Sequence, residues 1–289
     1  MINFVALPLI VAIAIALLGS RVLDRLQPAT AARRSSVLLA AVPIAAVPTL
    51  WLIGLSGLAH LGLRNPVIDW SHHLLPDYRP VGAIVGSASL VAAIAGTVRA
   101  GRVALHYRRL RCTETGPLEI IETDEIYAYT MPGPAATIAI STGLRNALAD
   151  DEYNFVVAHE QAHGRHRHDR YKLLALLATA FVPPMQSVTA RLDYYIERWA
   201  DEESLATTGA ERRLAARTIA KVALAATSPT PALGIADRGA AARAHALLAP
   251  VDHPAMTIRI QSALIIGITV SLAAYQLHHS MMFGLDIIR

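Results

Sequence analysis

Two histidines and a glutamate form the pattern in this chain that says most about chemistry. The segment His159-Glu160-Gln161-Ala162-His163 is an HExxH motif. Side chains four residues apart lie on one face of an α-helix, so both imidazoles can reach one metal ion, while Glu160 is turned by about 100° and can act on a water beside that ion. The pattern predicts a zinc site with Glu160 as general base.

A catalytic zinc ion needs a third protein ligand and an open position. The segment Tyr194 to Leu205 is predicted to be a helix on which Glu197 and Asp201 share a face. We predict Glu197 as the third ligand and Asp201 as the acceptor for an N–H of a ligand imidazole, which fixes the tautomer of the ring. The alternatives are that Glu202 or Glu203 replaces Glu197, or that these acids are simply solvated.

His166 shares the face of His159 and His163, and His168 follows it. This spacing does not fit the longer HExxHxxGxxH pattern. Because residues 165–170 are all polar, we predict a solvated or interfacial helix end here and no further metal ligand.

The elements that must position the motif are a helix and a few short strands. Asp150 and Asp151 are expected as the N-cap and first-turn acids of the helix that carries HExxH. Before it, three β-prone runs separated by turn formers predict a small antiparallel meander. The last run is also a candidate edge for pairing with an extended substrate. The three runs are Leu118–Glu122, Ile126–Thr130 and Ala136–Ser141.

The composition is typical of a membrane protein with a soluble part. Of 289 residues, 54% are hydrophobic and 17% charged, with a mean hydropathy of +0.39, which excludes a disordered chain. The net charge is +4, and the basic residues stand beside apolar runs, which favours lipid headgroups over nucleic acid as their partner. The single cysteine, Cys112, leaves no disulfide pair, so a metal site must use histidines and carboxylates.

Four apolar stretches without Asp, Glu, Lys or Arg are long enough to cross a bilayer, which takes about 20 residues. A fifth run, Leu173–Ala190, is broken by Pro183-Pro184, so we predict a buried or membrane-grazing helix there. The four predicted spans are Met1–Ser20, Ser35–Leu63, Pro80–Val98 and Ile260–Leu285.

Arginines set the predicted orientation, since cytoplasmic loops are enriched in Lys and Arg. The loops after the first and third spans are rich in arginine, whereas two aspartates balance two arginines after the second. We expect the plasma membrane, with both termini outside and the soluble part in the cytoplasm. The expected fold is a mainly α membrane protein with about four transmembrane helices and a cytoplasmic α+β domain: residues 1–111 with three spans, a zinc-binding domain at 112–259 and a closing span at 260–289.

Four segments together resemble the antirepressor and β-lactam-sensor family of membrane gluzincin metallopeptidases. The family's layout of three spans, a cytoplasmic peptidase domain and a closing span is also similar, and the likeness covers most of the chain. It implies one zinc ion per chain held by His159, His163 and Glu197, with Glu160 as general base. The segments are Ser141-Thr142-Gly143-Leu144, Val157 to His163, Arg167-His168-Asp169, and Glu197-Arg198-Trp199-Ala200-Asp201.

Two departures qualify the resemblance. Only a few residues follow the last predicted span, so we do not expect the extracellular penicillin-binding domain of the best-known members. The segment from His253 to Ile260 is similar to the HPxxxxRI segment of the HtpX and Ste24-type peptidases, a sister group in which this His and Arg lie near the active site. His253 and Arg259 are thus candidates for substrate or oxyanion contacts; the alternative is an ordinary helix start and an interfacial arginine.

The sequence therefore predicts an integral-membrane zinc endopeptidase that cleaves a protein or peptide at the cytoplasmic face, in regulatory proteolysis such as repressor or partner cleavage. One alternative is HtpX-like quality control of membrane proteins. The other is a non-catalytic membrane signalling scaffold. The lipid bilayer is an expected partner and nucleic acid is not, while the substrate, the signal and the oligomeric state cannot be predicted from the sequence.

Overall fold

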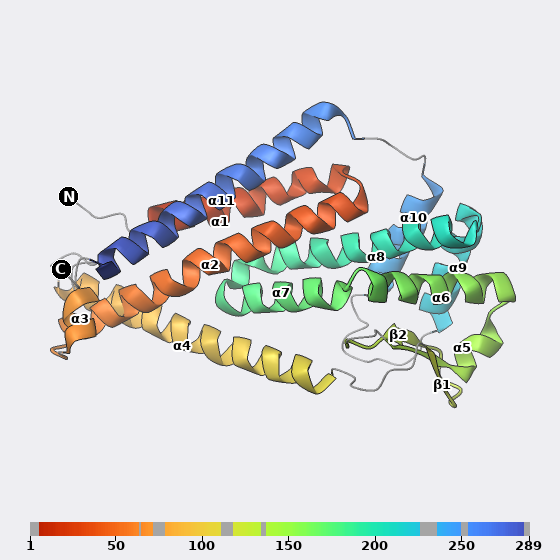
Figure 1. The fold of residues 1–289 in the computed structure, drawn as a ribbon, viewed down its shortest axis with the longest axis horizontal. Helices are drawn as coiled ribbons and strands as arrows, with labels where there is room; N and C mark the ends of the chain where they lie inside the picture. The colour runs from red at the N-terminus through yellow and green to blue at the C-terminus, as the bar shows by residue number, and fades with distance from the viewer. Residues whose placement is uncertain are drawn as a thin grey trace.

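The computed structural model describes residues 6–63, 65–71, 79–110, 118–133, 137–225, 236–249 and 254–285. Within these residues the chain is mostly helical and contains one small sheet. The long apolar helices extend to one end of the molecule, and the sheet with its covering helices forms the other end (Figure 1). The expected class, a mainly α membrane protein with a small α+β part, is confirmed.

Four helices are long and apolar enough to cross a membrane, as predicted. α1 begins and α11 ends on the same side of the bundle, the side opposite the sheet (Figure 1). The short helix α3 (Pro66–Ser71) lies at that end too. The four long helices are α1 (Leu7–Gly19, continued by the 3-10 helix η1, Ser20–Arg25), α2 (Pro28–His60), α4 (Arg79–Leu110) and α11 (Met256–Leu285).

Glycines bring α2 and α4 into close contact. A Cβ atom added to Gly57 would lie 2.4 Å from the Cα atom of Gly86, and one added to Gly54 would lie 2.8 Å from the Cα atom of Leu90. Small residues permit such an approach of two backbones in a membrane, where packing takes the place of the hydrophobic effect as the force between helices. A larger side chain at Gly57 or Gly86 would force the two helices apart.

The sheet consists of β1 (Leu118–Ile121), β2 (Ala128–Thr130) and β3 (Ile138–Ser141), in the order β1-β3-β2. β3 pairs in parallel with β1 and antiparallel with β2. The predicted antiparallel meander is therefore wrong. All four residues of β3 are buried, so this strand takes the centre, and the exposed strand β1 takes an edge.

The central position of β3 also contradicts its predicted role as an edge strand that pairs with substrate. Both sides of β3 are occupied by strands of the sheet. Hydrogen bonds from Gly143 N and Thr142 Oγ1 to Thr123 O hold the β1–β2 connection against the end of β3. This connection passes the end of β3, so β2 pairs with the other side of that strand. Among the described residues, no strand pairs with the outer edge of β2, the strand that contacts the HExxH helix.

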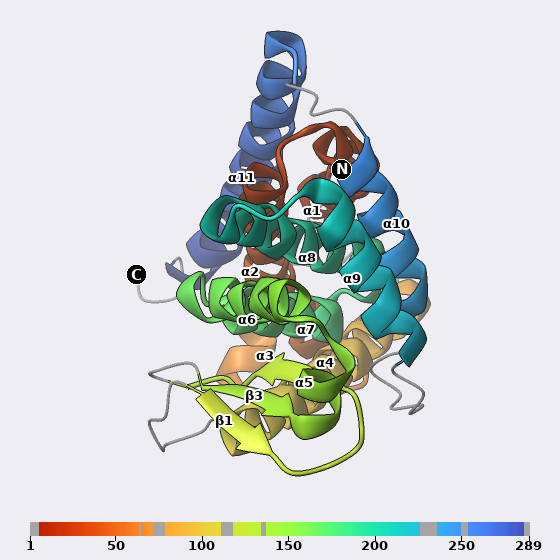
Figure 2. The same cartoon turned by 90° about the vertical axis from the view of Figure 1, so that its right-hand side faces the viewer.

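Helices cover the sheet and connect it to the membrane helices. α6 lies across one face of the sheet (Figure 2). The remaining helices are α5 (Thr142–Ala147), α6 (Asp150–Arg165), α7 (His168–Phe181), η3 (Pro183–Met185), α8 (Gln186–Thr208), α9 (Arg212–Ala225) and α10 (Ala236–Leu248).

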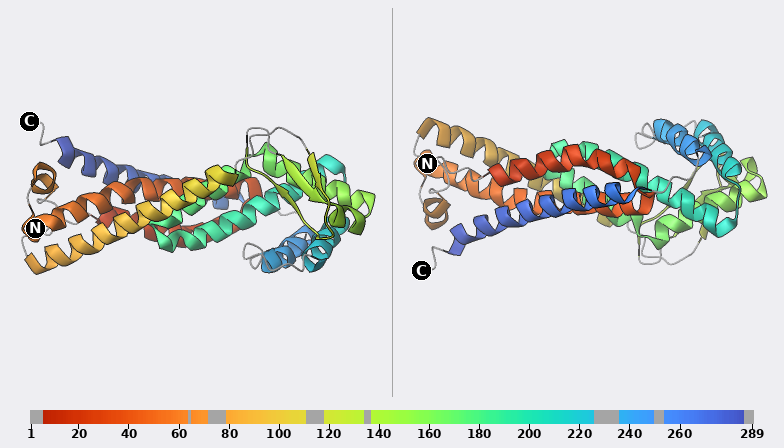
Figure 3. Two further views of the ribbon diagram at one scale, coloured as in Figure 1. Left: turned by 90° about the horizontal axis from the view of Figure 1, so that it is seen from below. Right: turned by 90° about the horizontal axis from the view of Figure 1, so that it is seen from above.

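The α7–η3–α8 hairpin extends from the sheet end back along the membrane helices (Figure 3). Its tip is apolar: Val182, Met185, Val188 and Leu192 are buried in one cluster with side chains of α1 and α2. The predicted apolar run at 173–190 is thus a hairpin that is buried on one side and has its turn at the two prolines.

A polar contact adds to this packing. The carboxylate of Asp24, in η1, accepts hydrogen bonds from Arg191 and Tyr195 of α8. α8 is therefore attached to the membrane helices by apolar packing and by this polar contact.

Candidate metal centre and active site

The helix that carries HExxH is fixed at its start by a buried carboxylate. Glu152 Oε2 accepts a hydrogen bond of 3.1 Å from the Ala149 N–H and one of 2.7 Å from Lys221 Nζ. The N-cap is Ala149, so the predicted N-cap role of Asp150 and Asp151 is wrong; both lie in the first turn, where acids complement the helix dipole. Lys221 belongs to α9, so this contact also positions α6 against α9.

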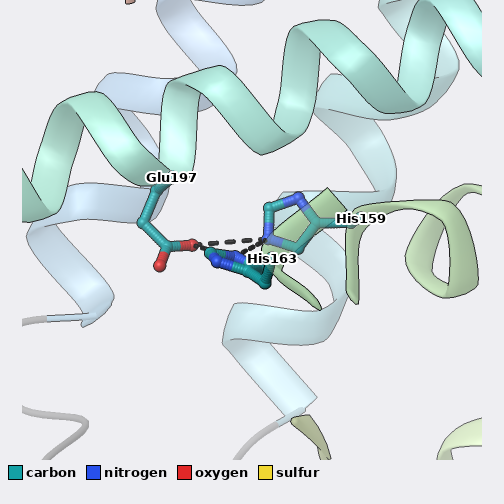
Figure 4. Close-up of side chains that lie close together, drawn as sticks. All are labelled: His159, His163 and Glu197. Atoms are coloured by element: carbon teal, nitrogen blue, oxygen red, sulfur yellow. Dashed lines mark hydrogen bonds and ion pairs between the residues drawn. The ribbon is translucent and has the colours of Figure 1, made fainter. Parts of the chain in front are cut away.

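Three ligand atoms from two helices converge on one point (Figure 4). The Nε2 atoms of His159 and His163 are 3.0 Å apart. Oε2 of Glu197, on α8, lies 3.4 Å from His159 Nε2 and 3.6 Å from His163 Nε2. The structure thus brings together the three residues expected to bind a metal.

The size of this triangle fits a zinc ion. Zinc bonds to histidine nitrogen and carboxylate oxygen are about 2.0–2.2 Å long, so ligand atoms at the corners of a tetrahedron are roughly 3.3 Å apart. The observed separations of 3.0, 3.4 and 3.6 Å bracket that value. Two imidazoles and one carboxylate are also the donor set of one known class of catalytic zinc sites.

The Nδ1 atoms of His159 and His163 have different partners. His159 Nδ1 lies 3.1 Å from Oδ1 of Asp201, in the position predicted for this acid. His163 Nδ1 lies 2.9 Å from Nδ1 of His168. Partners at Nδ1 leave both Nε2 atoms facing the same point, the orientation that a metal ion requires.

Arg243, on α10, completes the centre and was not predicted. Its guanidinium forms a two-pronged contact with Asp201, 2.6 Å from Nη2 to Oδ1 and 2.9 Å from Nε to Oδ2. Its Nη1 atom also lies 3.1 Å from Glu197 Oε2. An arginine in an alanine-rich helix gives no spacing signal that links it to residues about forty positions away.

The electrostatics of the centre keep both carboxylates ionised. Burial alone would raise the pKa of Asp201, but Arg243 and His159 together outweigh burial and lower it. Burial is likewise outweighed at Glu197, whose pKa lies well below its usual range because of the nearby His163 and Lys172. Lys172 Nζ is 3.3 Å from Glu197 Oε1. A metal cation bound at this centre would therefore be stabilised by the negative charges of Glu197 and Asp201.

The histidines respond to these charges in opposite ways. Burial disfavours the charged form of His159, but hydrogen bonds to Asp201 and Glu197 outweigh this and raise its pKa to about 9. Burial, together with neighbouring His163, lowers the pKa of His168 to about 2. His168 is therefore neutral, and its Nδ1 can accept a hydrogen bond from the N–H of His163.

Glu160 is held by a residue of the sheet. The hydroxyl of Thr130, on β2, lies 2.7 Å from Glu160 Oε2 and 2.8 Å from the Glu160 carbonyl oxygen. The contact joins the edge strand to the HExxH helix at the residue expected to be the general base. No pattern in the sequence indicates Thr130, because strand pairing decides which residue faces α6.

The predicted solvated or interfacial helix end is right in that α6 ends at Arg165, which is exposed, but wrong for His168, which is buried. His168 is 1% exposed, and both rings pack against Trp199 of α8. Arg167, between them, has φ 53°, a left-handed conformation that turns the chain and starts α7 in a new direction. The position of His168 therefore cannot be derived by continuing the helical repeat from His163.

The two other acids considered as third ligands have different partners. Glu202 accepts hydrogen bonds from Arg198 and Arg212, and Glu203 pairs with Arg165 and His166. Both lie on α8 and are paired with these residues instead of with His159 or His163. Among residues 197–203 of the described chain, the metal-ligand group contains only Glu197.

Of the two residues of the HPxxxxRI-like segment, the structure describes only Arg259, which is not part of the metal-ligand group among the described residues. His253 lies outside the described residues. Arg259 is in the first turns of α11, where its carbonyl oxygen accepts a hydrogen bond from Arg34 of α2, and α11 packs mainly on α1 and α2. The arginine that approaches the ligand glutamate is Arg243.

The fold and the site together define a protein with four membrane-type helices and an HExxH helix that meets a glutamate from a second helix. Residues 102–193 match the family model for Peptidase family M48, which includes the HtpX and Ste24-type peptidases. The match spans about a third of the chain and includes the HExxH motif, but it ends before Glu197. No curated protein and no solved structure gives a significant match. The antirepressor resemblance stays a prediction.

Proposed function

We propose that this protein is a membrane-bound zinc endopeptidase, with His159, His163 and Glu197 as zinc ligands and Glu160 as general base. The observation that carries the proposal is the triangle of ligand atoms with sides of 3.0, 3.4 and 3.6 Å. It is supported by the M48 match over the HExxH motif. The peptidase part would comprise residues 112–259, between a membrane part at 1–111 and the closing span at 260–289.

A zinc ion at this site would lower the pKa of a water molecule to about 7 and polarise the scissile carbonyl. Glu160 removes the proton of the attacking water and delivers it to the leaving amine. The hydrogen bond from Thr130 fixes the orientation of the Glu160 carboxylate during both transfers. Asp201 and His168 keep the two ligand rings in place.

The open edge of β2 is a suitable place for an extended substrate. Tyr127 O accepts a hydrogen bond from Ser141 N, and Met131 N donates to Thr137 O, so these residues point their backbone groups toward β3. Because backbone groups alternate along an antiparallel strand, those of Ala128 and Thr130 point to the open side. A substrate strand paired there would run beside Glu160 and would be recognised mainly through its backbone.

We infer that cleavage occurs on the cytoplasmic side of the plasma membrane. The arginine-rich segments are η1 with the start of α2, and the last part of α4 from Arg99, and both lie at the end of the bundle that faces the sheet (Figure 1). Cytoplasmic loops are enriched in arginine. Both chain termini would then lie outside, since α1 begins and α11 ends at the opposite end.

The first test compares wild type with Glu160→Gln, both as full-length protein in nanodiscs. We expect about one zinc ion per chain in both, and a loss of 10²-fold or more in hydrolysis of an unfolded reporter protein by the variant. Gln161→Ala, on the exposed side of the same helix, is the matched control and should keep full activity. Protein that contains no zinc, together with an unchanged cellular effect of Glu160→Gln, would favour the non-catalytic scaffold instead. Equal hydrolysis by wild type and Glu160→Gln would contradict the role of Glu160 as general base.

The number and kind of substrates would distinguish a regulatory peptidase from a quality-control peptidase. Regulatory cleavage of a repressor or partner is the role implied by the antirepressor resemblance, whereas the M48 match favours quality control of the HtpX kind. Cells that express Glu160→Gln should accumulate uncleaved substrates. A single accumulating protein would support regulation, and many misfolded membrane proteins would support quality control.

A further inference from the structure

A groove of about 510 Å³ lies between α4 and the α7–η3–α8 hairpin. Arg99 and Arg102 of α4 line one side. Thr179 of α7 and Gln186 at the start of α8 supply polar groups on the other side, and Leu176 and Pro183 supply apolar surface. Its volume is within the range of small-molecule sites, roughly 300–1,000 Å³. The groove is separate from the metal centre, to which none of its lining residues belongs.

The groove lies at the level where a bilayer changes from hydrocarbon to headgroups. The uncharged part of α4 ends at Val98, after a stretch about as long as a membrane span, and the helix continues to Leu110. Phe181, at the end of α7, packs against Gly96, inside that uncharged stretch. Arg99 and Arg102 are therefore the first charged residues of α4 beyond the hydrocarbon, on the side of the sheet.

The charges of the groove are uncompensated. Within the described residues, no acidic side chain lines it, and neither arginine forms an ion pair. Arg99 donates from Nε to the carbonyl oxygen of Ala95 in its own helix, which leaves its terminal nitrogens for other partners. Both arginine side chains are exposed. Two unpaired guanidinium groups beside apolar surface complement a phosphate that carries acyl chains.

We propose that this groove binds the headgroup of an anionic phospholipid. Arg99 and Arg102 hold the phosphate, and the Thr179 hydroxyl and the Gln186 amide contact the polar remainder of the headgroup. Leu176, half-exposed, and Pro183 face the start of an acyl chain. Basic pockets between membrane helices on the cytoplasmic side are known to bind anionic lipids in this manner. A bound lipid would join α4 to α7, the helix that begins at His168.

The test measures lipid binding to the full chain in mild detergent by native mass spectrometry. Phosphatidylglycerol is the probe, and phosphatidylcholine with the same acyl chains is the comparison. We expect wild type to prefer phosphatidylglycerol, and the double variant Arg99→Gln, Arg102→Gln to bind it about 30-fold more weakly. The matched control is Arg108→Gln, Arg109→Gln, two exposed arginines of α4 outside the groove, which should keep the preference. Equal melting temperatures would show that the variants fold.

Three results would overturn the proposal. The first is equal binding of the two lipids by wild type, which would indicate an apolar groove without headgroup recognition. The second is an equal loss in the control variant, which would indicate attraction to overall positive charge. The third concerns a photo-crosslinking residue at Thr179 in cell membranes: adducts with protein in place of phospholipid would indicate that the groove holds a polypeptide segment.

Discussion

Oδ1 of Asp201 lies 3.1 Å from Nδ1 of His159 and also receives a hydrogen bond of 2.6 Å from Arg243. The carboxylate therefore orients a ligand ring while a buried cation holds the carboxylate in place. Partners of this kind change metal affinity by about 10- to 100-fold when they are lost. We predict such a loss of zinc affinity in Asp201→Asn, measured by competition with a chelator. Glu211→Gln, an exposed acid beyond the end of α8, should behave as wild type.

The hydroxyl of Thr130 gives a test of how the general base is positioned. Thr130→Val keeps the shape of the side chain but removes the donor to Glu160. Loss of a hydrogen bond to a charged group should lower kcat roughly 10- to 100-fold, with unchanged zinc content. Thr130→Ser should restore most of the activity, because it restores the donor. A variant that loses zinc along with activity would instead point to a general disturbance of the site.

Arg243 compensates two buried carboxylates, so its removal should be costly. Breaking a buried ion pair by removing one partner destabilises proteins by about 3–5 kcal/mol. We expect Arg243→Met to lower the melting temperature of the metal-free protein strongly, and Arg243→Lys to lower it less, since lysine keeps the charge but not the two-pronged contact. Zinc should raise the melting temperature of Arg243→Met more than that of wild type, because the ion supplies positive charge. Equal gains would argue against this role.

Glu152 predicts a dependence of stability on pH. Its hydrogen bond with Lys221 lowers its pKa below the usual 4.5 although burial acts in the opposite direction. Its contribution is therefore present above pH 4.5 and is lost as the pH falls through the lowered pKa. Glu152→Gln should lose about 1–2 kcal/mol at pH 7, and the difference from wild type should disappear in acid. A double-mutant cycle with Lys221→Gln checks that the two residues act together.

Local spacing predicted much of the centre. His159 with His163, and Glu197 with Asp201, are each four residues apart, and helix geometry alone puts each pair on one face. The four long apolar helices were predicted on length and composition, which a bilayer constrains strongly.

Contacts between distant segments account for what the sequence did not reveal. Arg243 reaches Asp201 because α10 packs near α8, and no periodicity encodes that packing. The order of the strands depends on pairing between β1 and β3, which lie on either side of β2 in the chain. The predicted exposure of His168 was wrong because one left-handed residue, Arg167, ends the helical repeat on which the prediction depended.

α8 carries Glu197, and one face of its first two turns, with Val188 and Leu192, packs against α1 and α2, while Asp24 of η1 contacts the helix further along. The residue proposed as the third zinc ligand thus lies on a helix whose start packs against the membrane helices. Removing residues 1–110 would remove the surface against which this helix packs, while leaving HExxH intact. We expect such a fragment to keep the two imidazoles but to lose the fixed position of Glu197, so the membrane helices would be needed for the geometry of the proposed metal centre as well as for anchoring.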